Sequence, residues 1–140
     1  MNRISLSQAN RIIEAAFAKG AELGLKPLSV AVVDAGGHLI AFQRQDGASM
    51  ARLQVAAGKA AGALALGVSS RKVAELAVER PTFFAGFAAS APNGIIAAAG
   101  GVIVVNEGGP LGAVGVTGDT SDNDEIAALA GIEAAGLKAQ

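Results

Sequence analysis

The chain has 140 residues, with 11 basic and 12 acidic side chains, no cysteine, and five phenylalanines as its only aromatic residues. Its length and its 51% hydrophobic composition predict one domain over residues 1–140, and the balanced charge argues against nucleic acid as a partner. The absence of cysteine excludes disulfides and thiolate metal sites. The lack of a signal peptide or of a long apolar stretch predicts a cytoplasmic protein with no membrane partner.

Periodic apolar residues and turn signals predict alternating groups of helices and strands. Ser5 and Gln8 have the capping-box spacing that starts a helix, and Gly24 followed by Pro27 has the features that end one. Short β-branched runs bounded by glycine-rich turns predict strands. The expected elements, in chain order, are helix 6–23, strands 28–33 and 38–44, helix 50–66, a helix capped by Ser69 or Ser70 and ending near 79, strands 95–99, 102–105 and 111–117, and helix 122–135.

This order, α-ββ-αα-βββ-α, predicts an α/β (α+β) domain in which helices pack on a mainly antiparallel five-stranded sheet. Alternation in the second strand of the predicted hairpin places four side chains on one face: His38, Ile40, Phe42 and Arg44. The phenylalanine-rich segment around 83–87 follows a proline and is expected to be irregular.

The charged and polar residues of the first half include three candidates for chemistry. His38 has an imidazole that can ligate haem iron or transfer a proton, although a lone histidine after a turn is also commonly just exposed. Arg44 can bind a ligand carboxylate through two N–H groups or pair with Asp46 or Asp34. Lys59 stands in a small apolar run, so its ammonium reaches solvent, pairs with a carboxylate, or faces a cavity as an anion site.

Two patterns in the second half have structural explanations that are stronger than their functional ones. The glycine-rich run 112–118 lacks the spacing of a dinucleotide-binding loop, and its glycines are typical of tight turns and close packing. Asp119, Asp122 and Asp124 resemble the start of a calcium loop but lack its glycine and distal glutamate, so helix capping explains them better.

Several ordered blocks of the chain closely resemble the GlcG/HbpS-like proteins. These blocks cover nearly the whole chain, and they are Val30–Leu39, Arg44–Ala48, Lys59-Ala60, Gly100-Gly101-Val102, and Gly112–Gly118 with Asp124. The resemblance implies a profilin-like three-layer domain that forms homo-oligomers, is commonly described as haem-binding, and is similar to the carboxyl-terminal domain of some cobalamin adenosyltransferases. Matching positions imply a ligand pocket formed by Asp34, Gly36, Gly37, His38, Arg44, Lys59, Gly101 and Asp124, and Phe42 is a candidate for its apolar wall.

Three functions are compatible with these residues. The first is binding of haem or another tetrapyrrole as a small organic ligand, in which His38 ligates iron and Arg44 or Lys59 meets a propionate. The second is a cofactor-independent isomerase, tautomerase or lyase for a small carboxylate or phenolic acid, in which Arg44 orients the anion and His38, Asp34 or Lys59 transfers a proton. The third is an assembly protein whose small-residue surfaces, including Gly58, form an oligomer.

Overall fold

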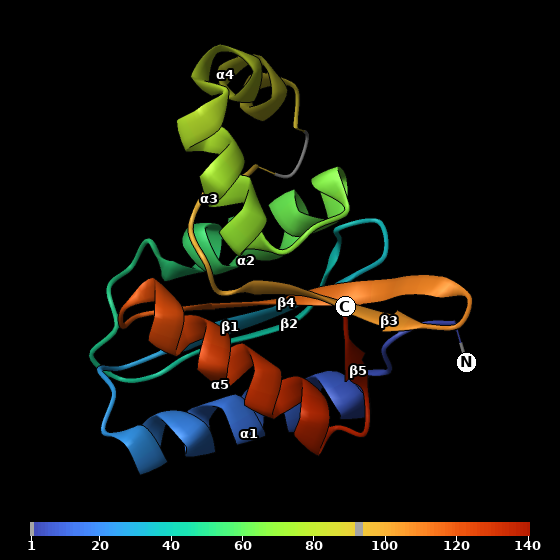
Figure 1. The fold of residues 1–140 in the computed structure, drawn as a ribbon. Helices are drawn as coiled ribbons and strands as arrows, with labels where there is room; N and C mark the ends of the chain where they lie inside the picture. The colour runs from blue at the N-terminus through green and yellow to red at the C-terminus, as the bar shows by residue number, and fades with distance from the viewer. Residues whose placement is uncertain (1, 92–93) are drawn as a thin grey trace.

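The computed structural model describes residues 2–91 and 94–140, which contain five helices and five strands (Figure 1). Among these residues, no helix combines the length and apolar character needed to cross a bilayer. The elements are α1 (Leu6–Leu23), β1 (Ser29–Asp34), β2 (Leu39–Arg44), α2 (Arg52–Leu66), α3 (Ser70–Glu79), α4 (Pro81–Ser90), β3 (Gly101–Asn106), β4 (Gly109–Thr117), α5 (Ser121–Ala134) and β5 (Lys138–Ala139).

The strands form one sheet in the order β2-β1-β4-β3-β5, and every neighbouring pair is antiparallel. Figure 1 shows α1 and α5 covering one face of this sheet, α2 covering the other, and α3 and α4 extending beyond α2. The side chains of Val30, Val32, Val114 and Val116 form the core with α1 and α5. The expected five-stranded antiparallel sheet in a three-layer α+β domain is therefore confirmed.

Local chemistry sets the limits of α1 as the sequence predicts. The Ser5 hydroxyl accepts a hydrogen bond from the Gln8 backbone N–H at 3.0 Å, and the Gln8 side chain accepts one from the Ser5 N–H at 2.9 Å. Gly24 ends the helix with a φ of 66°, in the left-handed region that a glycine adopts without strain. Ile12 and Ile13 are fully buried on the face that packs against the sheet and α5.

The segment 95–99 is not a strand, contrary to the sequence-based expectation. Ile95 and Ile96 instead lie against α2, where a Cβ added at Gly62 or Gly58 would come within 2.5 and 2.7 Å of their side chains. The Ile96 N–H donates to the Gly58 carbonyl at 3.2 Å, so this segment satisfies its backbone on a helix rather than in the sheet. The expected strand was wrong because apolar content alone does not say which neighbour an extended segment packs against.

Two further elements differ from the expectation. The phenylalanine-rich segment forms α4, because Pro81 occupies the first turn, where its missing N–H costs no hydrogen bond. The fifth strand is β5, which pairs Ala139 with Val104 at the edge of β3. A two-residue strand at the chain end carries no periodic signal, so only the tertiary pairing defines it.

A β-bulge in the hairpin also changes the predicted faces of β2. Val32 pairs with Ala41 and Val33 pairs with Leu39, which leaves Ile40 as an extra residue. Ile40 packs with the core under α1, whereas Phe42, opposite Ala31, lies on the α2 side of the sheet. The strict alternation from position 38 to position 44 was therefore wrong, because the bulge inverts it near the turn.

Candidate functional site

The structure places the predicted site residues in three separate parts of the molecule. Asp34 and His38 lie at the turn between β1 and β2, and Arg44 lies at the other end of β2. Lys59 is buried beside Asp124, which is in α5. A six-residue strand is roughly 20 Å long, so His38 and Arg44 of one chain do not face a common small ligand.

An apolar groove runs along the side of α2 and ends at the β1–β2 turn. Two cavities of about 230 and 430 Å³ form it, and both are lined by α2 and by Gly94. The larger cavity alone is within the range of small-molecule sites, which are mostly apolar and hold roughly 300–1,000 Å³. We call this feature the α2 groove, and it is lined by Gly36, Gly37, Leu53, Ala57, Gly58, Ala61, Leu64, Ala65, Ile95 and Ile96, among others.

The β1–β2 turn places a histidine beside the groove and a carboxylate behind the histidine. Asp34 Oδ1 accepts backbone N–H groups from Gly36 at 2.9 Å and His38 at 3.0 Å. The His38 backbone bond is the largest cause that lowers the pKa of Asp34, although desolvation opposes it, so the carboxyl stays ionised at neutral pH. The imidazole lies over Gly36, because a Cβ added there would come within 2.9 Å of its Cε1.

The Asp34 carboxylate also orients the imidazole. Nδ1 of His38 lies 3.3 Å from Asp34 Oδ1, and the histidine side chain is 75% exposed. A carboxylate facing Nδ1 favours the tautomer that carries its proton there, which leaves the lone pair on Nε2. His38 is therefore prepared to act as a metal ligand or a base through Nε2.

Lys59 forms a buried ion pair and does not line the groove. Its Nζ donates to Asp124 Oδ2 at 3.1 Å and to the Val116 carbonyl at 3.0 Å, and both charged side chains are at most 3% exposed. Desolvation is the largest cause of the lowered pKa of Lys59 and of the raised pKa of Asp124. Of the three roles open to Lys59, the structure shows pairing.

The glycines near Lys59 have a packing role in this structure. A Cβ added at Gly101 would overlap the Lys59 carbonyl oxygen, and one added at Gly100 would lie 3.0 Å from Nζ. Gly101 was a predicted ligand-binding residue, and the structure places it under the α2 backbone. Its small size is what lets helix and strand approach so closely.

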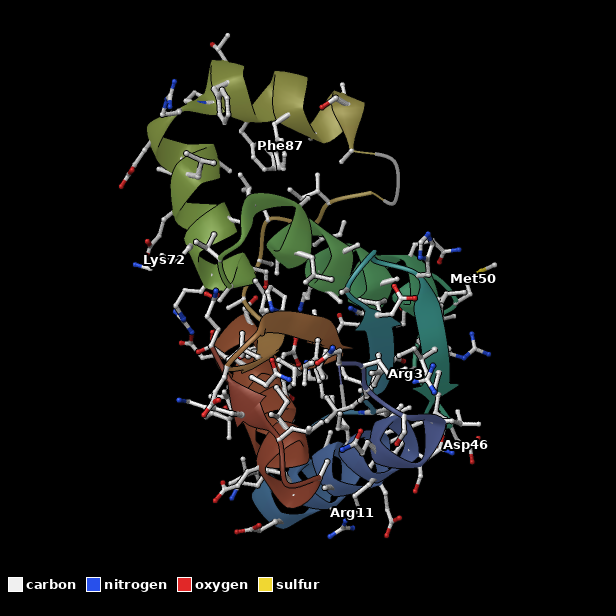
Figure 2. All side chains as sticks on the ribbon, turned by 90° about the vertical axis from the view of Figure 1, so that its right-hand side faces the viewer. Arg3, Arg11, Asp46, Met50, Lys72 and Phe87 are labelled. Carbon is white, nitrogen blue, oxygen red and sulfur yellow. The ribbon has the colours of Figure 1, made fainter. Side chains whose placement is uncertain are left out.

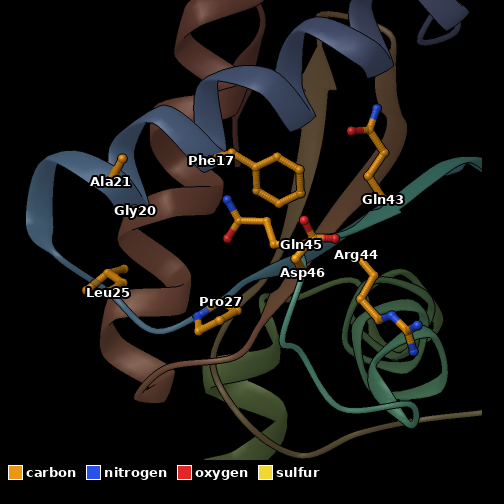
Figure 3. A pocket seen from close by; sticks show the side chains of 9 residues that line it. All are labelled: Phe17, Gly20, Ala21, Leu25, Pro27, Gln43, Arg44, Gln45 and Asp46. Atoms are coloured by element: carbon orange, nitrogen blue, oxygen red, sulfur yellow. The ribbon is translucent and has the colours of Figure 1, made fainter.

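Arg44, at the end of β2, lines a second depression, whereas Phe42 lies on the α2 side of the sheet and is not among the residues that line it. This depression, about 590 Å³, lies between α1 and the end of β2 and is lined by Phe17, Gln43, Arg44 and Asp46, among others. Figure 3 shows the Arg44 side chain on the opposite side of β2 from Phe17. Within the described part of the chain, Arg44 has no carboxylate within 4.0 Å, so neither Asp46 nor Asp34 pairs with it.

The acidic residues at the start of α5 do not form a metal centre. Asp122 pairs with Arg71, Asp124 pairs with Lys59, and Asp119 accepts N–H groups from Lys26 and Thr120. Thr120 caps the helix by accepting from the Asn123 N–H. Over residues 2–91 and 94–140, no group of three histidine, cysteine or acidic side chains is arranged to hold a metal ion.

Sequence reasoning missed a polar cluster at the start of α2. Arg52 donates from Nη1 to the Thr117 hydroxyl at 2.7 Å, although the two residues are 65 positions apart. Ser29, the β1 residue paired with Thr117, is fully buried. The available signal was weak: a cation at the first position of an alanine-rich helix and hydroxyl residues at the ends of two apolar strands.

The three-layer fold and the apolar groove define the class: an α+β domain with a groove of the size and apolar character of small-molecule sites. A family model described as haem degrading protein HbpS-like matches residues 4–133. An uncharacterised 15.0 kDa protein of Citrobacter freundii, from the dhaT–dhaS intergenic region, is 30% identical over 125 residues, covering 89% of this chain and 87% of that protein. The chain therefore belongs to the HbpS-like family.

Solved structures agree with this assignment. A doubly substituted HbpS from Streptomyces reticuli is 30% identical, with a TM-score of 0.79 over 92% of this chain and 84% of that one. PduOC, solved as a complex with haem, has a TM-score of 0.85 over 97% of each chain at 20% identity. At that identity the likeness to PduOC shows a shared fold, and the haem belongs to that protein.

Proposed function

We propose that the chain binds haem or a related tetrapyrrole in the α2 groove, with Nε2 of His38 as the iron ligand. The observation that carries the proposal is the placement of Asp34 behind Nδ1, since a carboxylate there holds the imidazole with Nε2 available to a metal. Gly36 both lines the groove and lies under the imidazole, so the histidine that would ligate iron is next to the apolar surface. Membership of the HbpS-like family supports the same ligand.

The side chains of the groove fit a flat apolar ligand. Ala57 and Ala61 are small residues on its α2 wall, and Leu53, Leu64 and Ile96 provide larger apolar contacts. A bound haem would supply an iron centre, while Asp34 orients the imidazole and the apolar walls exclude water. The cofactor-independent enzyme has less support, because His38, Arg44 and Lys59 do not converge within one chain.

A visible absorption titration with haemin tests this function. The wild-type chain is expected to show a saturable Soret shift at one haem per chain, and His38→Ala should abolish it because the iron ligand is lost. Asp34→Asn should weaken haemin binding by about 10-fold or more, since it removes the carboxylate that orients the imidazole.

Two further variants test whether a loss of haemin binding comes from the groove itself or from substitution in general. Ala65 is exposed and lines the groove, so Ala65→Trp should block haemin binding while the circular dichroism spectrum stays native. Asp46→Asn makes the same change as Asp34→Asn on an exposed residue outside the groove, and its titration should match wild type. Equal, unsaturating absorption changes in wild type and His38→Ala would contradict the proposal.

We also infer that the chain forms a homo-oligomer through α4, in the cytoplasmic setting that the sequence predicts. α4 is apolar, buries none of its residues, and leaves Phe83 46% exposed. Figure 2 shows Phe87 on this helix, which projects from the body of the domain. An apolar helix in this position is typical of an interaction surface.

Light scattering after size-exclusion chromatography tests the oligomer. The wild-type mass is expected to be a multiple of 13.7 kDa, and Phe83→Asp should shift it to the monomer because the charge would be buried in the interface. Leu6→Asp adds the same charge at an exposed position on α1, across the sheet, and should leave the mass unchanged. A monomeric wild type at all concentrations would refute the interface.

A further inference from the structure

The polar cluster at the start of α2 is built from three neighbouring strands and the helix above them. In the sheet, Ser29 of β1 pairs with Arg44 of β2 on one side and with Thr117 of β4 on the other. Paired residues project to the same face, and this is the face that α2 covers. Arg52, the first residue of α2, reaches down to Thr117. We call these four residues the Arg52 site.

Two groups in the Arg52 site lack the partners that such groups normally have. The Ser29 hydroxyl is fully buried, and among the described residues it is the only buried side-chain oxygen or nitrogen without a hydrogen-bond partner. The Arg52 guanidinium donates to the hydroxyls of Ser49 at 2.9 Å and Thr117 at 2.7 Å, which leaves three N–H donors. In the described part of the chain, no carboxylate lies within 4.0 Å of it.

The start of α2 has no side-chain cap, although the Arg52 backbone N–H donates to the Ser49 carbonyl at 3.4 Å. Its N-cap residue is Ala51, whose side chain has no acceptor, so the first backbone N–H groups of the helix receive no side-chain cap. The amino end of a helix also carries partial positive charge, which favours an anion. Hydroxyl and guanidinium donors therefore meet near the positive end of this helix.

The charges around the site leave an excess of positive charge. Lys59 is near enough to Arg52 for repulsion between them to contribute to its lowered pKa, after the larger effect of desolvation. The carboxylate of Asp124 is already held by Lys59, and that of Asp119 is held by the Lys26 and Thr120 N–H groups. Asp46 lines the same depression as Arg44 but forms no ion pair with it (Figure 3).

We propose that the Arg52 site binds the carboxylate of a small organic ligand. Arg52 presents a planar fork that matches a carboxylate in two parallel hydrogen bonds, and the Ser29 hydroxyl supplies a third donor. Arg44, which is exposed and pairs with Ser29 in the sheet, adds a second positive charge on the β2 side. The site is separate from His38, so it stands whether or not the α2 groove takes haem.

Benzoate is the probe, and benzamide is its uncharged counterpart of nearly equal shape. In ¹H–¹⁵N NMR titrations, benzoate is expected to bind saturably and to shift the Arg52 side-chain Nε–H signal together with the backbone amides of Ser29 and Thr117. Benzamide should produce no such shifts. Arg52→Gln should weaken benzoate binding at least about 10-fold because it removes the charged fork, and Arg52→Lys should weaken it less.

Ser29→Ala separates a ligand role from a structural one, because the two roles predict opposite signs. Removing an unpaired buried hydroxyl should raise the melting temperature of the free protein while it weakens benzoate binding several-fold. Arg11→Gln removes the same charge on α1, far from Met50 and the start of α2 in Figure 2, and should leave benzoate binding unchanged. The carboxylate assignment would be overturned if benzoate and benzamide bound equally. It would also be overturned if inorganic phosphate shifted these signals and benzoate did not.

Discussion

Asp124→Asn is expected to lower the free energy of unfolding by about 3–5 kcal/mol, because it leaves the ammonium of Lys59 buried without its counter-charge. Lys59 Nζ is 3.1 Å from the Asp124 carboxylate, and both side chains are almost fully buried. Water therefore cannot replace the carboxylate as the partner of the ammonium. Asparagine retains the shape and can still accept the Asp119 N–H. Urea denaturation of both proteins at pH 7 measures the loss.

The pH dependence of Asp124→Asn gives a second readout with a defined sign. Without the carboxylate, desolvation and, to a smaller degree, the charge of Arg52 hold the pKa of Lys59 below the ordinary lysine value. At a pH between the lowered pKa of Lys59 in the folded variant and the ordinary lysine pKa of the unfolded chain, the unfolded state binds more protons than the folded state. The free energy of unfolding of the variant therefore rises with pH over this range. The deficit of the variant should therefore shrink as the pH approaches about 10.4, the ordinary lysine pKa.

A double variant tests whether the loss comes from the unpaired charge. Lys59→Met with Asp124→Asn removes both charges, and replacing a buried ion pair with uncharged groups is commonly close to neutral. The double variant should therefore be more stable than Asp124→Asn alone. If it is instead destabilised by the sum of the two single changes, the pair has no coupling and its structural role is refuted.

Gly115→Ala is expected to lower the free energy of unfolding by about 3 kcal/mol or more, because the added methyl cannot fit between β4 and α2. A Cβ at Gly115 would overlap the Ala56 carbonyl oxygen and lie 2.9 Å from its carbonyl carbon. Both neighbours are backbone, so no side chain can move aside. The helix would have to shift away from the sheet, which would also disturb Lys59. Thermal and urea denaturation measure the effect.

Gly86→Ala is the matched control for Gly115→Ala. A Cβ at Gly86 meets no atom within 4 Å, and the residue lies in the exposed helix α4. The same substitution should stabilise that helix by roughly 0.5–1 kcal/mol, since alanine loses less backbone entropy than glycine in a helix. Similar destabilisation by both substitutions would mean that close packing of α2 is not the cause.

Part of the candidate site was predictable from the sequence. Asp34, Gly36 and His38 share one short turn, so their proximity follows from local chain geometry, and the structure places them together. The predicted grouping of Arg44 and Lys59 with His38 depended on strand alternation and on the path of α2. The bulge at Ile40 breaks the alternation that linked Arg44 to His38, and Lys59 is buried in an ion pair with Asp124.

The sequence by itself determined the elements whose signals are local. The capping box at Ser5 and the glycine stop at Gly24 are properties of neighbouring residues, and so are the β-branched runs of the hairpin. The bounds of α1 and of the two hairpin strands were therefore predicted closely. The order of the predicted helices and strands likewise indicated the α+β class.

Only the tertiary structure decided the contacts that join residues far apart in the chain. Ile95 and Ile96 pack on α2 because glycines there leave room, Lys59 is paired because Asp124 of α5 reaches it, and Arg52 meets Thr117 across the sheet. Each of these outcomes depends on which elements pack together and how closely. The pattern of apolar and polar residues along the chain does not give the distance between a helix and the sheet, so only the tertiary structure shows the groove and the Arg52 site.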